Sequence, residues 1–342
     1  MAARKWLEAW LNRCWYEDAP GSLLLWPLSV IYGGLAALHA LPWRTGLRRP
    51  AVLPVPVVVV GNITVGGTGK TPLVIWMAQV LREAGWRPGI ITRGYGREGG
   101  REARAVAQDD PAGRVGDEAL LLARRAGCPV VSGPDRVADA RLLLSSHDVD
   151  VIISDDGLQH HRLARTLEWV VIDGARGLGN GRLLPAGPLR EPVSRLQRVD
   201  ARVINGEPAT GRFDEALVMC LAGDRAVNLA DGREQPLSAF ARQTLHAVAG
   251  IGHPQRFFAH LRQIPGAVLH EHVFGDHHRY DSADLHFDDD AAIVMTEKDA
   301  VKCADFADGR CWYVPVAAEL PPVARQRLLD GLGQRPEIPE KA

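Results

Sequence analysis

The sequence predicts an α/β protein built on a mostly parallel β-sheet with helices on both faces, of the type found in P-loop kinases. From residue 55 onward, short apolar runs alternate with helical patterns, which favours strand–helix–strand units. The stretch "GNITVGGTGKTP" at 61–72 directly follows the apolar run "VPVVVV" and opens a predicted helix. The 342 residues exceed what one core usually spans, so we expect a second, smaller α/β domain.

Composition narrows the function classes. A hydrophobic content of 46% and a charged content of 24% are typical of a folded protein, not a disordered one. The net charge of -1 gives no reason to expect nucleic acid as a partner. The five cysteines include no Cys-x-x-Cys pair, so we expect free thiols in a reducing compartment.

The elements of the first domain follow in regular order. Ligands of such sheets bind at the carboxyl ends of the strands, so the loops after the strands are the places to look for chemistry. The predicted strands lie within 55–62, 88–96, 128–133, 148–157 and 167–174, and the predicted helices cover 71–84, 117–126 and 135–146.

A second alternating series begins near residue 245. Before it, residues 174–198 form a loop rich in Gly, Pro and Arg, and 216–232 predicts a hairpin that connects the two domains. The series itself has strands within 245–252, 266–274, 291–296 and 311–316 and a helix from Pro254. The predicted divisions are an N-terminal segment (1–49), a P-loop nucleotide-binding domain (50–212), a two-stranded linker (213–235), a second domain (236–330) and a frayed tail (331–342).

The N-terminal segment is predicted to be helical and membrane-associated. Residues 23–41 contain no acidic or basic residue other than His39, a length near the lower limit for crossing a bilayer. Pro27 and the Gly33–Gly34 pair weaken a straight span. The following arginines suit anionic headgroups on the cytoplasmic side; they are Arg44, Arg48 and Arg49.

A helix before residue 23 is predicted to have one apolar face with three tryptophans, a side chain suited to the lipid interface. The face consists of Trp6, Leu7, Trp10, Leu11, Cys14 and Trp15. The alternative is a helical hairpin packed on the protein's own core. A cleaved signal peptide is disfavoured, because the apolar stretch begins late and no small-residue cleavage site follows. The sequence does not separate a shallow helix from a single span.

The stretch at 61–72 predicts a nucleotide site. Backbone N–H groups of a glycine-rich loop at a helix N-terminus cradle phosphates, and the loop lysine reaches the β- and γ-phosphates of ATP. The hydroxyl after the lysine is expected to hold Mg²⁺. Thr64 stands where the strict pattern has glycine. The predicted nucleotide-binding residues are Thr64, Val65, Gly66, Gly67, Thr68, Gly69, Lys70 and Thr71.

Candidate carboxylates occur in two further segments, one at the end of a predicted strand and one at the start of a predicted helix. Asp155 ends an apolar strand, as a Mg²⁺ ligand of a P-loop enzyme should, and Asp156 lies beside it. The alternative is an ordinary acidic turn. Asp117 and Glu118 open a predicted helix, where acidic residues are also common for electrostatic reasons alone.

Histidines and arginines complete the candidates. His277, in the loop "DHH", is a candidate partner for a carboxylate in proton transfer, although a loop histidine is more often solvated. His160 and His161 follow the acidic turn and leave open a metal-dependent phosphoesterase. Arg136 and Arg190 suit a phosphate group, with solvated surface charge as the alternative.

Taken together, these segments resemble the tetraacyldisaccharide 4'-kinase family of Gram-negative bacteria, over nearly the whole chain. The motifs that carry the resemblance occur in the family's order: "GNITVGGTGKTP", "TRGYG", "VGDE", "SDDGLQHHRLAR", "VIDGARGLGNGRLLPAGPLRE", "FGDHHRY" and "MTEKDAVK". The family's phosphate loop also has threonine at the position of Thr64, which accounts for the departure from the strict pattern.

The resemblance implies transfer of the ATP γ-phosphate to the 4'-hydroxyl of a tetraacylated glucosamine disaccharide 1-phosphate, in lipid A biosynthesis. It implies a cytoplasmic-face inner-membrane enzyme with ATP and Mg²⁺ as cofactors, and no obligate protein partner. Its implied roles are a base at Asp117 with His277 as partner, Lys70 and Asp156 in catalysis, and Thr71, Asp155 and Glu118 near the metal. Arg136 and Arg190 are implied near the substrate.

Two other classes compete with this interpretation. A membrane-recruited P-loop ATPase that acts as a switch carries a lysine where Val65 stands here, so the missing lysine counts against it. A metal phosphoesterase that uses the Asp and His clusters leaves the phosphate loop unexplained.

Overall fold

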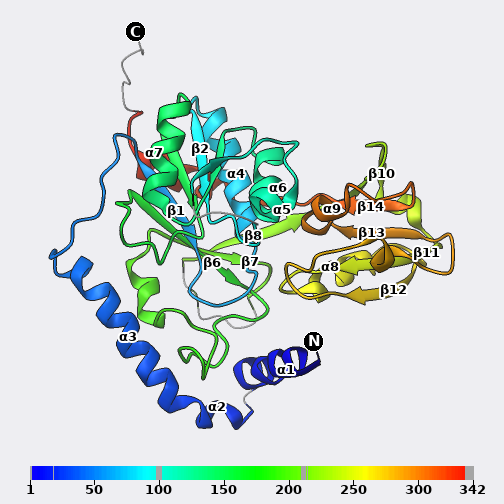
Figure 1. The fold of residues 1–342 in the computed structure, drawn as a ribbon, viewed down its shortest axis with the longest axis horizontal. Helices are drawn as coiled ribbons and strands as arrows, with labels where there is room; N and C mark the ends of the chain where they lie inside the picture. Colours follow the sequence, from blue (N-terminus) through cyan, green and yellow to red (C-terminus); the bar gives the residue numbers. More distant parts are fainter. Residues whose placement is uncertain (1, 18, 98–101, 209–212, 214, 336–342) are drawn as a thin grey trace.

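A computed structural model describes residues 2–17, 19–97, 102–208, 213 and 215–335, without the side chains of 2–6, 8 and 9. The described chain forms two sheets, one with nine strands and one with six. In Figure 1 the smaller sheet lies to the right of the larger one, and α1 (Ala2–Tyr16) and α3 (Trp26–Arg44) lie below the first domain. The mostly parallel first sheet with a second, smaller sheet confirms the predicted fold class.

The larger sheet has the order β15-β8-β7-β6-β1-β5-β2-β4-β3. Every neighbouring pair from β8 to β4 is parallel, whereas the edge strands β15 and β3 are antiparallel to their neighbours. The strands are β1 (Val57–Gly61), β2 (Pro88–Thr92), β3 (Arg104–Ala105), β4 (Val130–Ser132), β5 (Val151–Asp155), β6 (Leu167–Asp173), β7 (Ala201–Asn205), β8 (Leu217–Ala222) and β15 (Ala317–Glu319).

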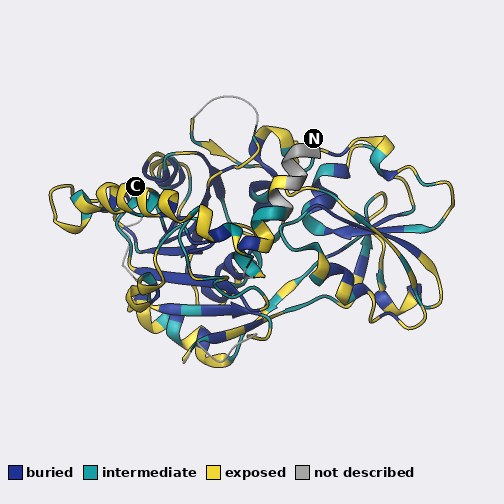
Figure 2. Ribbon diagram, turned by 90° about the horizontal axis from the view of Figure 1, so that it is seen from below, coloured by how far each residue is buried: buried dark blue, intermediate teal, exposed yellow. Residues whose placement is uncertain are grey.

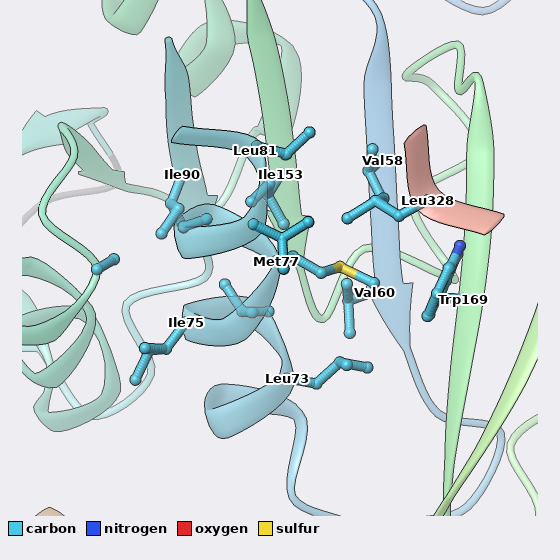
Figure 3. Close-up of a cluster of buried hydrophobic side chains, with 14 of the residues drawn as sticks. Val58, Val60, Leu73, Ile75, Met77, Leu81, Ile90, Ile153, Trp169 and Leu328 are labelled. Carbon is cyan, nitrogen blue, oxygen red and sulfur yellow. The ribbon is translucent and has the colours of Figure 1, made fainter. Parts of the chain in front are cut away.

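Helices cover both faces of this sheet, as predicted. The even-numbered valines of β1 pack against α4 (Lys70–Glu83), together with residues of α6 (Asp117–Arg125) and α10 (Pro322–Leu332). Figure 3 shows Val58 and Val60 beside Met77 of α4 and Leu328 of α10. The odd-numbered valines pack against α7 (Arg136–Ser146) on the other face. A continuous apolar strand such as β1 is therefore buried on both sides, which is the usual pattern of parallel sheets.

The smaller sheet has the order β10-β9-β14-β13-β11-β12. Its four strands β14, β13, β11 and β12 are parallel, and β9 and β10 extend it in antiparallel fashion. Its elements are β9 (Arg225–Asn228), β10 (Glu234–Pro236), β11 (Thr244–Ala249), β12 (Val268–Val273), β13 (Ala292–Thr296), β14 (Cys311–Val314), α8 (Pro254–Leu261) and α9 (Glu297–Cys303). Short helical turns are η1 (Val193–Arg198), η2 (Leu237–Phe240), η3 (Ser282–Leu285) and α5 (Ala112–Val115).

The predicted hairpin over 216–232 is wrong. Its two halves do form strands, but β8 pairs with β7 and β15 in the larger sheet, and β9 pairs with β10 and β14 in the smaller one. Met219 is buried in the first core and Ala226 in the second. Alternating apolar residues identify a strand but not its partner, and here consecutive strands belong to different sheets.

The chain also returns to the larger sheet after β14. β15 pairs with β8, and the buried residues Ala324, Leu328 and Leu332 of α10 join the core of the first domain. The predicted boundaries at 236 and 330 therefore do not follow the fold, because β15 and α10 complete the first sheet. Leu332 belonged to the predicted frayed tail but is buried, and residues 336–342 of that tail lie outside the described residues.

The N-terminal helices pack on the loop 178–190. Trp15 Nε1 donates to the carbonyl of Pro185 at 2.9 Å, and Asn180 Nδ2 donates to the carbonyl of Cys14 at 3.0 Å. In α3, Ser29 Oγ donates to the carbonyl of Leu183 at 2.7 Å. The prediction that the tryptophan face of α1 meets lipid is therefore wrong for Cys14 and Trp15, which face the protein. The side chain of Trp6 lies outside the described part.

The outer side of α2 (Gly21–Leu24) and α3 is apolar and exposed, and Figure 2 colours much of α3 as exposed. Leu24, Leu35 and Leu38 are 80%, 62% and 65% exposed, respectively. No helix in the described ranges combines the length and apolar content that crossing a bilayer requires. The five cysteines are free thiols, as predicted.

Candidate active site

The phosphate loop joins β1 to α4 and has the geometry that its glycines predict. Gly66 and Gly69 adopt positive φ angles of 97° and 89°, a conformation that glycine enters without strain. A Cβ on Gly69 would lie 2.2 Å from Nδ2 of Asn205, which donates to the carbonyl of Thr68 at 3.0 Å. The loop therefore requires glycine at 69, and it ends at the N-terminus of α4, where anions are favoured.

Lys70 is held in place by two side chains. Its Nζ donates to Oδ1 of Asn62 at 3.0 Å and lies 3.2 Å from Oδ1 of Asp156. Asn62 is fully buried, and its Nδ2 donates to the carbonyl of Thr64 at 2.8 Å. Asn62 thus connects the backbone of the loop to the lysine. Asn62 was not among the predicted site residues, although an asparagine directly after a predicted strand was the available signal.

Thr64 has a structural reason to differ from glycine. It forms an antiparallel bridge with Leu189, and its φ is not positive. On either side of it, Arg190 N donates to the carbonyl of Ile63 at 2.7 Å and Val65 N donates to the carbonyl of Pro188 at 2.9 Å. This position is extended backbone paired with the loop 183–190, so a side chain fits there.

The acidic turn lies beside the phosphate loop because β5 pairs with β1. Asp155 is buried, and desolvation together with the charge of Glu118 raises its pKa to about 6. Asp156 is only half-buried, and this partial burial acts to raise its pKa, but Lys70 and Arg190 outweigh it and lower the pKa to about 2. Asp156 has a φ of 48°, an uncommon conformation for a residue with a side chain. The pKa values of the two adjacent carboxylates are therefore shifted in opposite directions.

The two predicted substrate arginines occupy different positions. Arg190 Nη1 lies 3.6 Å from Oδ1 of Asp156, at the edge of the site. Arg136 is only 1% exposed, and it donates to the carbonyls of Gly133 at 2.6 Å and Asp155 at 3.2 Å. The position of Arg136 differs from the predicted substrate contact, because its guanidinium donates to backbone carbonyls, including that of Asp155 at the end of β5.

Asp117 and His277 meet across the two domains. Nδ1 of His277 lies 2.9 Å from Oδ2 and 3.2 Å from Oδ1 of Asp117. Burial acts to raise the pKa of Asp117, but the hydrogen bond from His277 and the charge of Lys298 outweigh it and hold the pKa below its usual value. The ring of Tyr95 lies 4.3 Å from that of His277, centroid to centroid. The pairing that the sequence analysis expected is thus formed in space.

Lys298 connects the acidic groups around this pair. Its Nζ donates to Glu118 Oε1 and to Asp276 Oδ1, both at 3.0 Å, and lies 4.0 Å from Oδ2 of Asp117. Burial acts to lower the pKa of Lys298, but Glu118, Asp276 and Asp117 raise it well above the usual value. The lysine is therefore a permanent cation that joins α9 to the first turn of α6. Lys298 lies in the motif "MTEKDAVK" but was not among the predicted site residues.

A second set of contacts joins the domains at the end of β6. His253 Nδ1 lies 3.3 Å and Arg256 Nη1 lies 3.4 Å from Oδ2 of Asp173. Arg256 Nη2 also donates to the carbonyl of Asn205 at 2.6 Å. A Cβ on Gly67 would meet the backbone of Gly252 at 3.7 Å, so the phosphate loop touches the second domain directly. The site therefore lies between the carboxyl ends of the larger sheet and the facing edge of the second domain.

The donors near the acidic turn fit a magnesium ion that is shared with phosphates. Asp155 Oδ1 is buried and has no hydrogen-bond partner among the described residues, while Oδ2 accepts from Thr92 at 3.1 Å. Mg²⁺ in phosphoryl-transfer enzymes is usually held by one or two carboxylates, water and substrate phosphates. The described residues contain no group of three or more His, Cys, Asp and Glu that could hold a metal by themselves, and His160 and His161 form no such group with the aspartates.

The model of the family described as "LpxK: Tetraacyldisaccharide-1-P 4'-kinase" matches residues 21–333. The chain belongs to this family. The match covers both sheets and most of the N-terminal helices, so it includes every predicted site residue. Family membership confirms the predicted function, a tetraacyldisaccharide 4'-kinase of lipid A biosynthesis, and the predicted class of enzyme, an ATP-dependent kinase.

Similar proteins support the assignment. The tetraacyldisaccharide 4'-kinase of Alkalilimnicola ehrlichii is 53% identical over 307 residues, which cover 88% of this chain and 90% of that protein. That of Nitrosococcus oceani is 50% identical over 309 residues and covers 90% of each. A crystal structure of LpxK from Aquifex aeolicus in complex with ATP is 27% identical, with a TM-score of 0.76 over 91% of this chain and 99% of that one.

The opposite pKa shifts of the two aspartates predict opposite effects on stability. The raised pKa of Asp155 means that its charge costs stability above about pH 6, and that this cost fades as the pH falls toward 3.8. Asp155→Asn should therefore raise the free energy of unfolding of the nucleotide-free protein by about 1–3 kcal/mol at about pH 8. Thermal unfolding at several pH values measures this effect.

Asp156→Asn is the matched control for that variant. The lowered pKa of Asp156 contributes stability that is present above 3.8 and is lost as the pH falls through about 2. We expect this variant to lower the unfolding temperature at about pH 8, where Asp155→Asn raises it. A loss of stability of similar size in both variants would contradict the assigned pKa shifts.

Proposed function

We propose that the chain transfers the γ-phosphate of ATP to the 4'-hydroxyl of a tetraacylated glucosamine disaccharide 1-phosphate, at the site between its two domains. The observation that carries the proposal is that the phosphate loop, the acidic turn and the Asp117–His277 pair converge on one edge of the larger sheet. The matched Aquifex aeolicus protein was crystallised in complex with ATP, which supports ATP as the donor. Family membership supports the lipid disaccharide as the acceptor.

The phosphate loop is proposed to hold the donor. Backbone N–H groups of residues 66–69 would face the phosphates, because the N–H of Val65 already donates to the carbonyl of Pro188. Lys70 would reach the β- and γ-phosphates. Asn62 holds the lysine in that direction before ATP arrives. Thr71 and Asp155 would hold Mg²⁺, which neutralises phosphate charge when it is bound, and Glu118 lies close enough for its charge to affect Asp155.

Asp117 is proposed to accept the proton of the 4'-hydroxyl. The acceptor oxygen forms a bond to the γ-phosphorus, the bond from that phosphorus to the bridging oxygen of ADP breaks, and the hydroxyl proton passes to the carboxylate. His277 orients this carboxylate through its Nδ1 contact at 2.9 Å. A carboxylate of low pKa is a weak base, but phosphoryl transfer depends mainly on positioning and charge neutralisation. A weakly basic Asp117 oriented by His277 is therefore sufficient for this reaction.

The exposed face of α2 and α3 is proposed to bring the enzyme to its acceptor. An acceptor with four acyl chains stays in a bilayer, so the enzyme must meet it at the membrane surface. The leucines on this face are exposed, whereas Ser29 and Tyr32 on the other side of α3 contact the loop 183–190. An apolar stripe of this type inserts shallowly at a lipid interface. We place the enzyme on the cytoplasmic face of the bacterial inner membrane.

Three substitutions test the division of roles in the active site. Lys70→Ala should abolish transfer, because the β- and γ-phosphates lose their cation. Asp117→Ala and His277→Ala should lower kcat by about 10²–10⁴-fold with little change in ATP affinity. The assay incubates the protein with radiolabelled ATP, Mg²⁺ and the acylated disaccharide, and follows label in the lipid phase.

His278→Ala is the control for those variants, because His278 lies in the same loop but pairs with Asp284. It should retain most of the activity. If Asp117→Ala and His277→Ala weaken ATP binding as strongly as Lys70→Ala does, the proposed separation of donor and acceptor roles is wrong.

Substitution of exposed leucines of α3 tests the proposed membrane attachment. Leu35→Asn combined with Leu38→Asn should weaken binding to vesicles by at least about tenfold, because two buried leucine side chains contribute a few kcal/mol at a lipid interface. Vesicle flotation measures the binding. Val273→Asn, at a valine in the second domain that is 54% exposed, is the control and should bind like the unmodified protein. Equal binding by the α3 variant would refute attachment through this face.

A further inference from the structure

A basic cleft is lined by residues at the C-terminal end of α3 and by residues of the first domain. Figure 1 shows the course of α3 along the first domain. It encloses about 370 Å³ between the last turn of α3, the segment after the acidic turn, and η1. Its charged and aromatic lining consists of Trp43, Arg44, His161, Arg165, Glu168, Arg195 and Arg198. Neither the phosphate loop nor the Asp117–His277 pair contributes to this lining.

The cleft has more positive than negative charge. Glu168 accepts from Arg165 and from Arg195, both at 2.6 Å, and Arg195 Nε lies 3.3 Å from Glu191. These contacts hold two guanidinium groups rigidly in the wall. In the described part of the chain, Arg44 and Arg198 form no ion pair with a carboxylate. The cleft therefore has two exposed cations whose charge is not neutralised, beside a wall in which Arg165 and Arg195 are paired with Glu168 and Glu191.

The pKa of His161 reflects the same excess of positive charge. Burial and the positive charges of Arg165, His39, Arg195 and Arg44 lower its pKa to about 4. The imidazole is therefore neutral at physiological pH and has an N–H group to donate. Its ring lies 6.0 Å from that of His39 on α3, centroid to centroid, so the histidine sits at the junction of the helix and the domain. Guanidinium groups around a neutral donor suit an anion with several oxygens.

The position of the cleft indicates which anion it takes. Arg44 belongs to the last turn of α3, and Leu41 and Leu38, about one and two turns before it, are 51% and 65% exposed. Leu47, three residues after the end of α3, is 82% exposed, and Trp43 lines the cleft itself. Basic residues beside a surface-lying apolar helix face the headgroup layer of a membrane. A lipid phosphate would reach the cleft from the same side as the apolar face.

We propose that the basic cleft binds the phosphate of an anionic phospholipid headgroup, separately from the acceptor lipid in the active site. This inference rests on the proposed attachment of α2 and α3 to the membrane. The ligand is a glycerophospholipid phosphate held by Arg44 and Arg198, with His161 as a neutral donor. The bound headgroup fixes the end of α3 against the first domain.

Vesicle binding by the full chain tests the proposal. Arg44→Gln combined with Arg198→Gln should bind vesicles of phosphatidylcholine mixed with phosphatidylglycerol about tenfold more weakly, and neutral phosphatidylcholine vesicles unchanged. The charge-matched control is Arg141→Gln combined with Arg325→Gln, two exposed arginines outside the cleft. An equal loss in the control would overturn the proposal, because the effect would then be general charge attraction.

The test separates this proposal from the membrane attachment on which it rests. If the unmodified protein binds neither type of vesicle, attachment fails and the cleft proposal fails with it. If the unmodified protein binds both types equally well and the cleft variant does the same, attachment stands and only the cleft proposal fails.

Two further measurements identify the source of the phosphate. With the acylated disaccharide in neutral detergent micelles, the cleft variant should keep the KM of the unmodified enzyme. A raised KM would mean that the cleft takes the 1-phosphate of the acceptor instead. By NMR of labelled histidine, anionic vesicles should raise the pKa of His161, and inorganic phosphate at the same phosphate concentration should not. An equal rise with inorganic phosphate would assign the cleft to a free anion.

Discussion

The parallel pairing of β1 with β5 is the constraint on which the rest of the site depends. The register places Val60 opposite Asp155, so the loop after β1 and the turn after β5 leave the sheet side by side. Lys70, at the start of α4, therefore lies 3.2 Å from Asp156. Without this register the cation and the carboxylates would be buried apart, each at a cost of several kcal/mol. The four valines of β1, buried on both faces, hold the pairing in place.

Burial of Asp155 lowers the stability of the ligand-free protein but leaves an oxygen available for a ligand. Asp155 is buried with one carboxylate oxygen unpartnered among the described residues, an arrangement that costs free energy in the folded protein without its ligands. Active sites commonly retain such groups because the ligand supplies the missing partner. The second domain is equally necessary, because it supplies His277 and Lys298. Its α9 contacts α6 through Lys298 and through the paired contacts of Arg125 with Glu297 at 2.6 and 2.7 Å, so the proposed acid–base pair is held by ionic contacts on both sides.

Local patterns predicted much of this structure, and long-range packing accounts for what they missed. The strands and helices from β1 to β6 follow from apolar runs and periodicity, and the phosphate loop follows from its glycines. The pairing of β8 could not be predicted in this way, because its alternation of apolar and polar residues would be the same in either sheet. The return of α10 to the first core likewise depends on a contact between residues more than a hundred positions apart. Arg136 was expected at the substrate because a guanidinium after a strand suits a phosphate group, but the carbonyls of Gly133 and Asp155 bind it inside the protein. The contacts of Asn62 with Lys70 and of Lys298 with Glu118 form only in the folded protein, so local sequence patterns do not indicate them.

The chain combines three parts: a glycine-rich loop proposed to bind phosphates, a second domain that supplies His277 to the proposed acid–base pair, and an apolar helix face with a basic cleft at its end. The central proposal is that Lys70 and Asp155 together receive a magnesium nucleotide. Calorimetric titration of the intact protein with ATP and Mg²⁺ tests this claim most directly. The account predicts one site per chain, with affinity that weakens as the pH falls through about 6, where Asp155 takes up a proton. Absence of binding at neutral pH, or an affinity that does not change over this range, would contradict it.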